Sequence, residues 1–540
     1  MKRLIYCLLI LAVIWNGCTD EEIVSNKSSV GKEVWMNIPF GAQDNGEVKV
    51  TTRATIGVVP ESRVYNLFVY LFVDGKRVYA HYFDNENMMV TKEDAIGAEV
   101  NCWYVENQTD ANGQTQGTIR AKAPSFTNGT MYIIANIDAD MVNISPEKLN
   151  YLHEESEIKS LAATLNQEIT SRNGYFPMSA KLEGISVSEE NGTFTPANQF
   201  PIQLERLDAK VEVKVRVASG NEISDTENGI TTTQALREFV PESWRVVNLP
   251  KGAYAIGRED ADYEDAGYFD TEPVAFETTG SEVFTYKDAN GNNKTVTGDV
   301  DGFSFYMLEN REAMKKTVDG NYHLRDMRTK HPTTGKYMEE GDKWEYAPEK
   351  GTYLEIKGDI LMDVDVTSEK KQQLTAQVTY YIHLGNINKS KDDYSIQRNT
   401  HYTYTITIKG VNKIELEVTS STENDPNKVK EEESGATGMV YVAKEATYTF
   451  DAHYSQRVFC FDAAFVNPET VTWYVKTPFG KEGSPNKVDD TEVPSGMDYK
   501  WVEFMVNEID ETTGAYSRNN QAYPGYKNNP NNEKSKNLMD

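Results

Sequence analysis

Two residues near the N-terminus, Cys18 and Arg53, have the chemistry and the surroundings for covalent processing. Cys18 ends an apolar run, residues 4–15, and acylation of its thiol would anchor the chain to a membrane. Arg53 lies in the stretch VTTRATIG, a connector between two apolar runs whose small and β-branched residues leave the arginine accessible to a protease. Other enzymes would carry out both reactions, so these residues predict a processed chain and not a catalyst.

The residues around Cys18 resemble a bacterial lipoprotein signal. A basic pair KR, the apolar run and the small pair NG precede the cysteine, and the acidic stretch TDEE resembles a surface-export signal. We expect a signal peptide over residues 1–17, acyl chains such as palmitate on Cys18, and a polar tether over residues 18–33. Trp15 stands where this signal usually has leucine, and the alternative is ordinary signal cleavage near Gly17.

Motifs for catalysis or metal binding are absent from the sequence. It contains no HExxH, GxSxG, Walker A or GxGxxG motif, and its seven histidines are scattered. Residues 288–293, DANGNN, approach a calcium loop, but glycine stands in the fourth place and not the sixth. An Asn-Gly hairpin turn between FTYK and KTVTG is our interpretation. We therefore expect no enzyme activity, no bound metal and no cofactor.

Two cysteines, Cys102 and Cys460, lie beyond the signal region, far apart in the sequence. A disulfide is open to an exported protein, but we expect two separate buried thiols. The absence of a CxxC pair argues against a structural zinc site.

Composition and charge limit the class of protein. Hydrophobic residues make up 39% of the 540 residues and charged residues 26%, which is typical of a folded protein. Tyr, Phe, Val and Thr recur in short runs, which favours β-structure. The formal net charge of −28 repels phosphate backbones, so nucleic-acid binding is excluded as the main function.

Period-two alternation and apolar runs predict strands in the first part of the chain. Val34, Met36, Ile38 and Phe40 alternate with other residues and predict a half-buried strand. Nearly continuous apolar runs at 64–73 and 129–137 predict buried strands, and Asp74-Gly75 predicts a hairpin turn. Leucine and isoleucine at helical spacing predict one helix over residues 146–169.

The predicted organisation is mostly β, with tandem sandwiches and a few short helices. We place a first β-domain at residues 34–200 and a second at 201–420, opened by the alternating stretch KVEVKVRV. A charged segment, 421–438, predicts a linker, and residues 439–540 predict an additional β-rich segment.

Several segments together resemble the fimbrillins, the lipoprotein subunits of type V pili in Gram-negative anaerobes. They are TTRATIG followed by RVYNLFVYLFV, then MYIIANID, FPMSAKLEGISV, LERLDAKVEVKV, FYMLENRE and NTHYTYTITIKGVNKIELEV. The order of these segments over residues 34–418 makes the resemblance specific, and the lipoprotein signal agrees with it. Residues 439–540 lie beyond it and are typical of longer tip or accessory members.

The resemblance implies two tandem, transthyretin-like β-sandwiches and assembly by strand exchange. A lipidated precursor reaches the outer membrane, where an arginine-specific protease cuts at Arg53-Ala54 and removes the strand with Val34, Met36, Ile38 and Phe40. The emptied groove then accepts a donor strand from another pilus subunit. Arg63 is a rival cleavage site, nearer to the next strand.

The position in the pilus is left open by the C-terminal residues KNNPNNEKSKNLMD, which have no alternating donor-strand pattern. Either the sequence is cut short, or the chain is a terminal subunit. A tip adhesin would bind a host or bacterial surface ligand, whereas an anchor would keep its lipid.

A different class of function is a glycan-binding surface lipoprotein of a carbohydrate-uptake system. Exposed Trp103, Trp344 and Trp473 could stack on sugar rings, although tryptophans at such places often belong to the core.

Without the resemblance, Arg53 would be a solvated loop residue and residues 34–40 a permanent strand.

Overall fold

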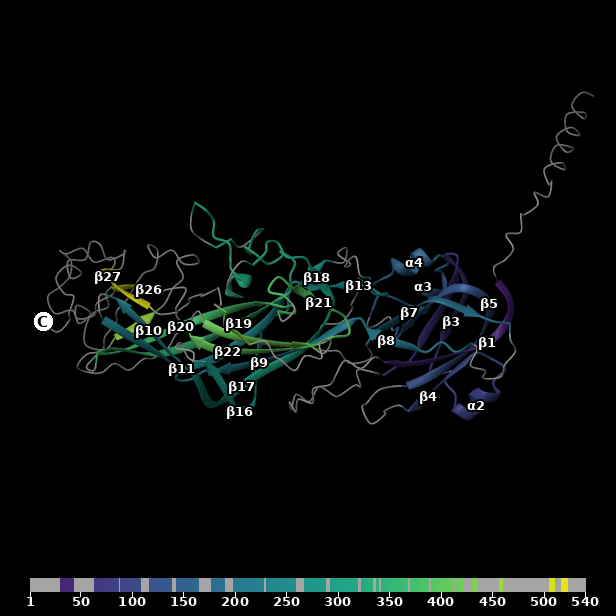
Figure 1. Ribbon diagram of the computed structural model, residues 1–540, viewed down its shortest axis with the longest axis horizontal. Helices are drawn as coiled ribbons and strands as arrows, with labels where there is room; N and C mark the ends of the chain where they lie inside the picture. The colour runs from purple at the N-terminus through teal and green to yellow at the C-terminus, as the bar shows by residue number, and fades with distance from the viewer. Residues whose placement is uncertain are drawn as a thin grey trace, which may run out of the picture.

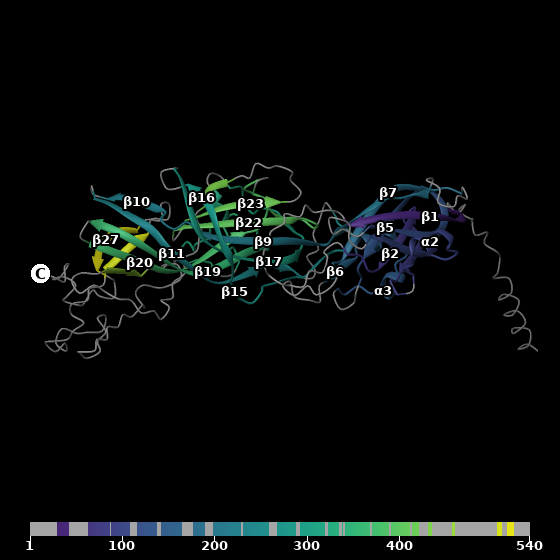
Figure 2. The same cartoon turned by 90° about the horizontal axis from the view of Figure 1, so that it is seen from below.

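The chain folds into two β-rich lobes that follow one another along a single long axis (Figure 1, Figure 2). The first lobe contains the N-terminal strands and three short helices, and the second contains two long-stranded sheets. The structure, a computed structural model, describes residues 30–42, 63–86, 88–107, 116–137, 142–164, 176–189, 198–227, 230–258, 267–287, 292–318, 322–333, 337–338, 341–367, 370–387, 390–410, 413–420, 430–434, 456–459, 505–509 and 516–522.

One seven-stranded sheet forms the frame of the first lobe. The elements of this lobe are β1 (Val30–Ala42), β2 (Leu67–Val73), β3 (Lys76–Phe83), α2 (Lys92–Gly97), β4 (Cys102–Asn107), β5 (Gln116–Ala135), α3 (Pro146–Asn150), α4 (Glu155–Lys159), β6 (Ala162–Thr164), β7 (Met178–Val187) and β8 (Ile202–Arg206).

The strands of this sheet form two layers, and β5, which is 20 residues long, takes part in both. Its first half pairs with β1 on one edge and β4 on the other, and its second half pairs with β7 and β2. Strand β8 pairs with both β1 and β7 and so joins the layers a second time. The apolar side chains between the layers form one cluster, to which β1 contributes.

Strand β2 explains why residues 64–73 are nearly all apolar. Leu67, Val69 and Leu71 face the space between the layers, whereas Phe68 and Tyr70 face a second cluster beneath α3 and α4. Figure 1 places α3 and α4 on one side of the lobe and α2 on the opposite side. The turn to β3 uses Asp74 and Gly75 at φ 49° and 76°, as the predicted hairpin requires.

The single helix predicted over residues 146–169 is wrong. The chain instead forms α3, then α4, then β6. Arg77 of β3 causes the break, because its side chain donates to the carbonyls of Asn150 and Leu152 at 2.7 Å each and its N–H donates to that of His153 at 2.9 Å. Those carbonyls can no longer continue a helix, and a capping box at Glu154 begins the next one.

The second lobe is a sandwich of two sheets. Its elements are β9 (Asp208–Val217), β10 (Glu222–Glu227), β11 (Ile230–Val247), β12 (Leu249–Pro250), β13 (Gly252–Tyr254), β14 (Tyr268–Phe269), β15 (Val274–Ala275), β16 (Glu277–Lys287), β17 (Asn293–Leu308), β18 (Asn310–Glu312), η2 (Tyr322–Asp326), β19 (Tyr353–Thr367), β20 (Lys370–His383), β21 (Tyr394–Ile396), β22 (His401–Gly410), β23 (Lys413–Ser420), β24 (Lys430–Ser434), β25 (Gln456–Phe459), β26 (Met505–Ile509) and β27 (Tyr516–Ala522).

One sheet has the order β10-β11-β19-β20-β25 and the other β16-β17-β9-β22-β23-β24. Their facing side chains form the largest apolar cluster, in which Val211, Val213 and Val215 represent β9. β16 pairs with β17 from Glu277 to Lys287, so the predicted hairpin around residues 288–293 is confirmed in its strands. The mostly β fold class predicted from the sequence is confirmed.

The described residues between β17 and β19, which are 309–318, 322–333, 337–338 and 341–352, lie outside the sandwich of the two sheets (Figure 1). Trp344, Tyr353 and Tyr381 pack together there. Arg325 is fully buried, with its guanidinium 3.9 Å from the Tyr394 ring centre and hydrogen bonds to the carbonyls of Leu384 and Lys391. We call residues 309–352 the excursion.

The lobes are joined by paired strands, apolar contacts and a buried hydrogen bond. β13 of the second lobe pairs with β6 of the first. Within the second lobe, Arg398 supports β13, because it donates at 2.7 Å to the Tyr254 carbonyl and also to the Glu309 carboxylate. The Arg206 side chain donates to Asn399 at 3.2 Å. These contacts continue the cluster beneath α3 and α4 across the junction.

Two strands lie at the boundaries predicted at 200/201 and 421–438. β8 belongs to the first sheet, so the chain enters the second lobe at Asp208. β24 lies inside the segment predicted as a linker and pairs with β23. Within the predicted C-terminal segment the structure describes β25, which pairs with β20, and the hairpin β26–β27.

Candidate functional site: the first strand and its groove

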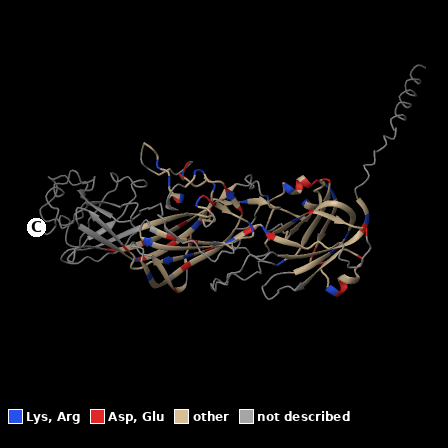
Figure 3. Ribbon diagram, in the orientation of Figure 1, with Lys and Arg blue, Asp and Glu red and all other residues tan. Residues whose placement is uncertain are grey.

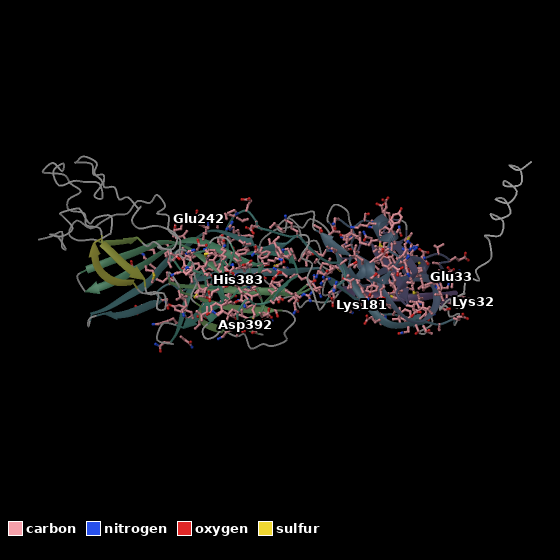
Figure 4. All side chains as sticks on the ribbon, turned by 90° about the horizontal axis from the view of Figure 1, so that it is seen from above. Lys32, Glu33, Lys181, Glu242, His383 and Asp392 are labelled. Atoms are coloured by element: carbon pink, nitrogen blue, oxygen red, sulfur yellow. The ribbon has the colours of Figure 1, made fainter. Side chains whose placement is uncertain are left out.

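Strand β1 is held on both of its edges. It runs antiparallel to β5, with Val34, Met36 and Ile38 opposite Ala123, Ala121 and Ile119. On its other edge, residues 40–42 run parallel to residues 202–204 of β8. Lys32 and Glu33 mark its start at the outer end of the first lobe, far from His383 in the second (Figure 4). The strand therefore fills a groove that reaches from this end toward the junction.

The inward side of β1 belongs to the core. Val34, Met36, Ile38 and Phe40 are 3%, 0%, 0% and 4% exposed and share one cluster with β2, β5 and β7. Burying an aliphatic or aromatic side chain of this size stabilises the fold by about 1.5–3 kcal/mol. The predicted burial of these four side chains is confirmed, and their removal would expose the cluster to water.

Phe40 lies in the groove between a glycine and a tryptophan. Its partner across the ladder is Gly117, and its ring centre lies 6.1 Å from that of Trp103. The Trp103 indole N–H donates to the Asp84 carbonyl at 3.2 Å, which fixes the orientation of the wall.

The outward side of β1 is also covered. The Trp35 ring lies 4.6 Å beneath the Arg120 guanidinium, and burial lowers the pKa of Arg120 although Cys102 lies nearby. Asn37 is buried beside it, and its side-chain oxygen has no hydrogen-bond partner. One orphaned buried acceptor costs about 1–3 kcal/mol. β1 is therefore a well-packed occupant of its groove with one polar defect.

A second wall of the groove comes from residues 198–200. The Asn198 side chain donates to the Trp35 carbonyl at 3.2 Å, and the Phe200 N–H donates to the Asn37 carbonyl at 3.0 Å. Removal of β1 would leave these donors and the β5 backbone without their present partners. An edge of this kind is a template for another strand.

The connector between β1 and β2 separates the two arginines weighed from the sequence. Arg53 and Ala54 lie outside the described residues, as does Cys18. Arg63 is described, and its carbonyl accepts a hydrogen bond from the buried Asn136 side chain at 2.7 Å. Its guanidinium lies 4.5 Å above the Tyr65 ring. A protease needs extended, free backbone, so these contacts disfavour cleavage at Arg63.

The tryptophans proposed to bind sugar do not form an exposed platform. Trp103 is 0% exposed and Trp344 is 1% exposed, so the expectation of exposed rings at these two positions is wrong. Trp103 closes the pocket of Phe40, and Trp344 packs edge-on to Tyr353, Tyr381 and His383. Trp473 lies outside the described residues.

Sequence reasoning missed a buried polar group beneath the excursion. The His383 ring lies 2.7 Å from the Asp326 carboxylate, and burial lowers the pKa of His383. Both residues are closed off by Trp344 and Tyr394, so this pair braces the excursion and meets no substrate. Their spacing in the sequence gives no signal.

We next consider metal ligands and thiols in the part of the chain that the structure describes. It brings together no group of three His, Cys, Asp or Glu side chains that could hold a metal ion. Cys102 is a buried free thiol whose pKa is raised by burial, and Cys460 lies outside the described residues. Among the described helices, none is both long and apolar enough to cross a membrane. Figure 3 shows basic and acidic residues interspersed over both lobes.

The chain is similar to one protein family and to several solved structures. A family described as "Domain of unknown function (DUF4906)" matches residues 305–406, which include the excursion. Among curated proteins, none matches the sequence.

Solved structures that match this chain include fimbrial proteins. A tip fimbrial protein from Porphyromonas gingivalis, with a C-terminal truncation, is 13% identical over 72% of this chain and 99% of its own, at a TM-score of 0.35. A fimbrilin from the same organism is 13% identical over 71% and 91%, at 0.34. A fimbrial assembly protein from Parabacteroides distasonis is 12% identical over 74% and 98%, also at 0.34.

These are the proteins that the sequence motifs resemble. Such low identities and TM-scores carry no argument about function. A proposal about function therefore depends on the geometry of β1 and its groove.

Proposed function

We propose that the chain is a structural subunit of a cell-surface pilus that assembles by donor-strand exchange. The observation that carries the proposal is β1, a strand seated in the core of the first lobe and joined to the next strand by the connector that contains Arg53. In the proposed role, this strand protects a surface that a second subunit uses later. Cleavage at Arg53-Ala54 by an arginine-specific protease would separate β1 from the rest.

The energetics support exchange over simple loss. Departure of β1 leaves four apolar positions, the β5 backbone and the residue 198–200 donors without partners. A donor strand from another subunit restores both the apolar burial and the ladder hydrogen bonds. The orphaned oxygen of Asn37 lowers the affinity of β1 for its own groove, so a better-matched strand can outcompete it.

The proposed route to the surface follows from the N-terminal residues. Acylation of Cys18 would hold the precursor in the outer membrane until the protease acts, after which the subunit joins the fimbrium. A tip or accessory position with a role in adhesion suits the additional C-terminal segment, and an anchor that is never cut is the other terminal role.

Protease treatment of the purified chain tests the proposal. A low dose of arginine-specific protease should give a new N-terminus at Ala54, loss of the β1 segment and uptake of an added donor peptide, VGKEVWMNIPFGA, into the groove. Arg53→Gln should stay uncut and take up no peptide, and the matched control Arg63→Gln should behave like the unaltered chain. A cut at Arg53 after which β1 stays bound and no peptide enters would overturn strand exchange.

A further inference from the structure

The floor of the β1 groove is uneven. Opposite Val34 and Met36 the floor consists of the methyl groups of Ala123 and Ala121, and opposite Ile38 it is Ile119. Opposite Phe40 there is no side chain, because the residue is Gly117. The groove thus has three shallow positions and one deep position at the end nearest the junction.

Gly117 leaves its space to an aromatic ring. A methyl group built on Gly117 would lie 2.5 Å from Cζ of Phe40 and 2.6 Å from the Tyr104 carbonyl oxygen, both closer than van der Waals contact. Its φ does not require glycine, since it is not among the residues at positive φ, so packing is the reason for this residue.

The walls of this pocket are fixed before any strand enters. Gly117 pairs with Val105 of β4 on the edge away from β1, and Trp103 of β4 stands beside the ring of Phe40. The Asp84 carbonyl holds the Trp103 indole, and α2 covers the outer face of β4. A pocket with fixed walls discriminates by shape better than one that can collapse.

We propose that Gly117 is a specificity-determining residue that makes the groove select a donor strand with an aromatic side chain at the position of Phe40. This inference rests on the proposed function. The matching strand runs antiparallel to β5 and parallel to β8, as β1 does. It carries aliphatic residues two, four and six positions before the aromatic one, facing Ile119, Ala121 and Ala123. The partner is therefore a β-strand of a second subunit, with an aromatic residue near its C-terminal end.

The test uses the full chain with a recognition sequence for a specific protease inserted after Arg53. After cleavage, the labelled peptide VGKEVWMNIPFGA is added, and displacement of β1 is followed by fluorescence anisotropy. The Phe40→Leu peptide should bind about tenfold more weakly or worse, as expected for loss of a ring from a rigid pocket. The control Met36→Leu keeps its volume in a shallow position and should stay within about threefold.

A variant of the groove sharpens the result. In Gly117→Ala the order of the peptides should change, so that Phe40→Ala binds better than the parent peptide, while Met36→Ala remains weaker than the parent in both chains. If Gly117→Ala fails to fold, the peptide series on the unaltered groove still decides.

The outcomes separate the two proposals. If no peptide enters the cleaved chain, strand exchange itself fails. If peptides enter but the Phe40→Leu and Met36→Leu peptides weaken equally, exchange stands and the aromatic selection by Gly117 is overturned.

Discussion

Strands β1 and β9 open the two lobes and occupy similar places in their sheets. Each runs antiparallel to one neighbour, β5 or β17, and parallel to another, β8 or β22. Each also turns alternate apolar side chains into a core. The parallel contact of β9 continues from Lys210 to Val217, whereas that of β1 covers only residues 40–42 in regular register.

The connections that follow the two strands differ more. β9 passes into β10 through a tight turn, in which the Gly220 N–H donates to the Leu236 carbonyl at 2.7 Å and the Asn221 side chain donates to the Lys409 carbonyl at 2.9 Å. β1 is followed by the long connector of residues 43–66. Under the proposed function, the connection that follows each strand decides which of the two can separate from its core.

Placing a carboxylate in each strand should give the largest test of the difference between β1 and β9. Burying an unpaired carboxylate should cost more than about 4 kcal/mol of unfolding free energy at either place. We expect Ile38→Asp to expel β1 only, leaving both lobes folded and the uncut chain able to bind the peptide VGKEVWMNIPFGA. Val213→Asp should abolish the cooperative unfolding of the second lobe. Urea unfolding and peptide anisotropy measure both; global unfolding of the first lobe by Ile38→Asp would contradict the comparison.

The comparison also requires that the lobes stay joined while β1 leaves. Arg206→Met removes the buried hydrogen bond to Asn399 across the junction, 3.2 Å long, and should cost about 1–3 kcal/mol, splitting one calorimetric transition into two. The control Arg237→Met removes an exposed ion pair with Asp363, 3.6 Å long, and should change stability by less than about 0.5 kcal/mol. A single unchanged transition in Arg206→Met would show that other contacts hold the junction.

Releasing the far end of the connector should shift the place of cleavage. Asn136→Ala removes the hydrogen bonds to the Arg63 and Phe176 carbonyls, at a cost of about 1–3 kcal/mol. Mass spectrometry of protease fragments should then show a second cut at Arg63, which Arg63→Gln in the same chain removes. If Asn136→Ala leaves Arg63 uncut, this hydrogen bond does not protect it.

Acid should weaken the fold slightly through two histidines that differ in their surroundings. Burial lowers the pKa of His383 in the second lobe and of His81 in the first below the ordinary 6.5. The unfolded chain therefore binds more protons below pH 6.5, and stability falls as the pH decreases from there. Melting curves from pH 7.5 to 5 should show this slope, and His383→Gln should flatten it. An unchanged slope in His383→Gln would assign the effect to other groups.

The sequence predicts well those elements whose pattern reports one local environment. The alternation of Val34, Met36, Ile38 and Phe40 gives both the strand and its buried side. The helix over residues 146–169 fails because Leu149, Ile158 and Leu161 share one cluster across a break, and a distant residue, Arg77, imposes that break. The pocket of Phe40 could not be predicted, since Gly117, Trp103 and Phe40 lie far apart in the chain and meet only through register.

The sharing of β5 between two layers has a mechanical consequence. β1 lies along the long axis of the molecule in Figure 2, side by side with the first half of β5. If the chain is part of a pilus, as proposed, tension along the fibre would load the hydrogen bonds between β5 and the strand in the β1 groove in shear, all together and not one by one. The second half of β5 pairs with β2 and β7 and would transmit the force to them near the junction. One continuous strand would therefore carry the force through the first lobe.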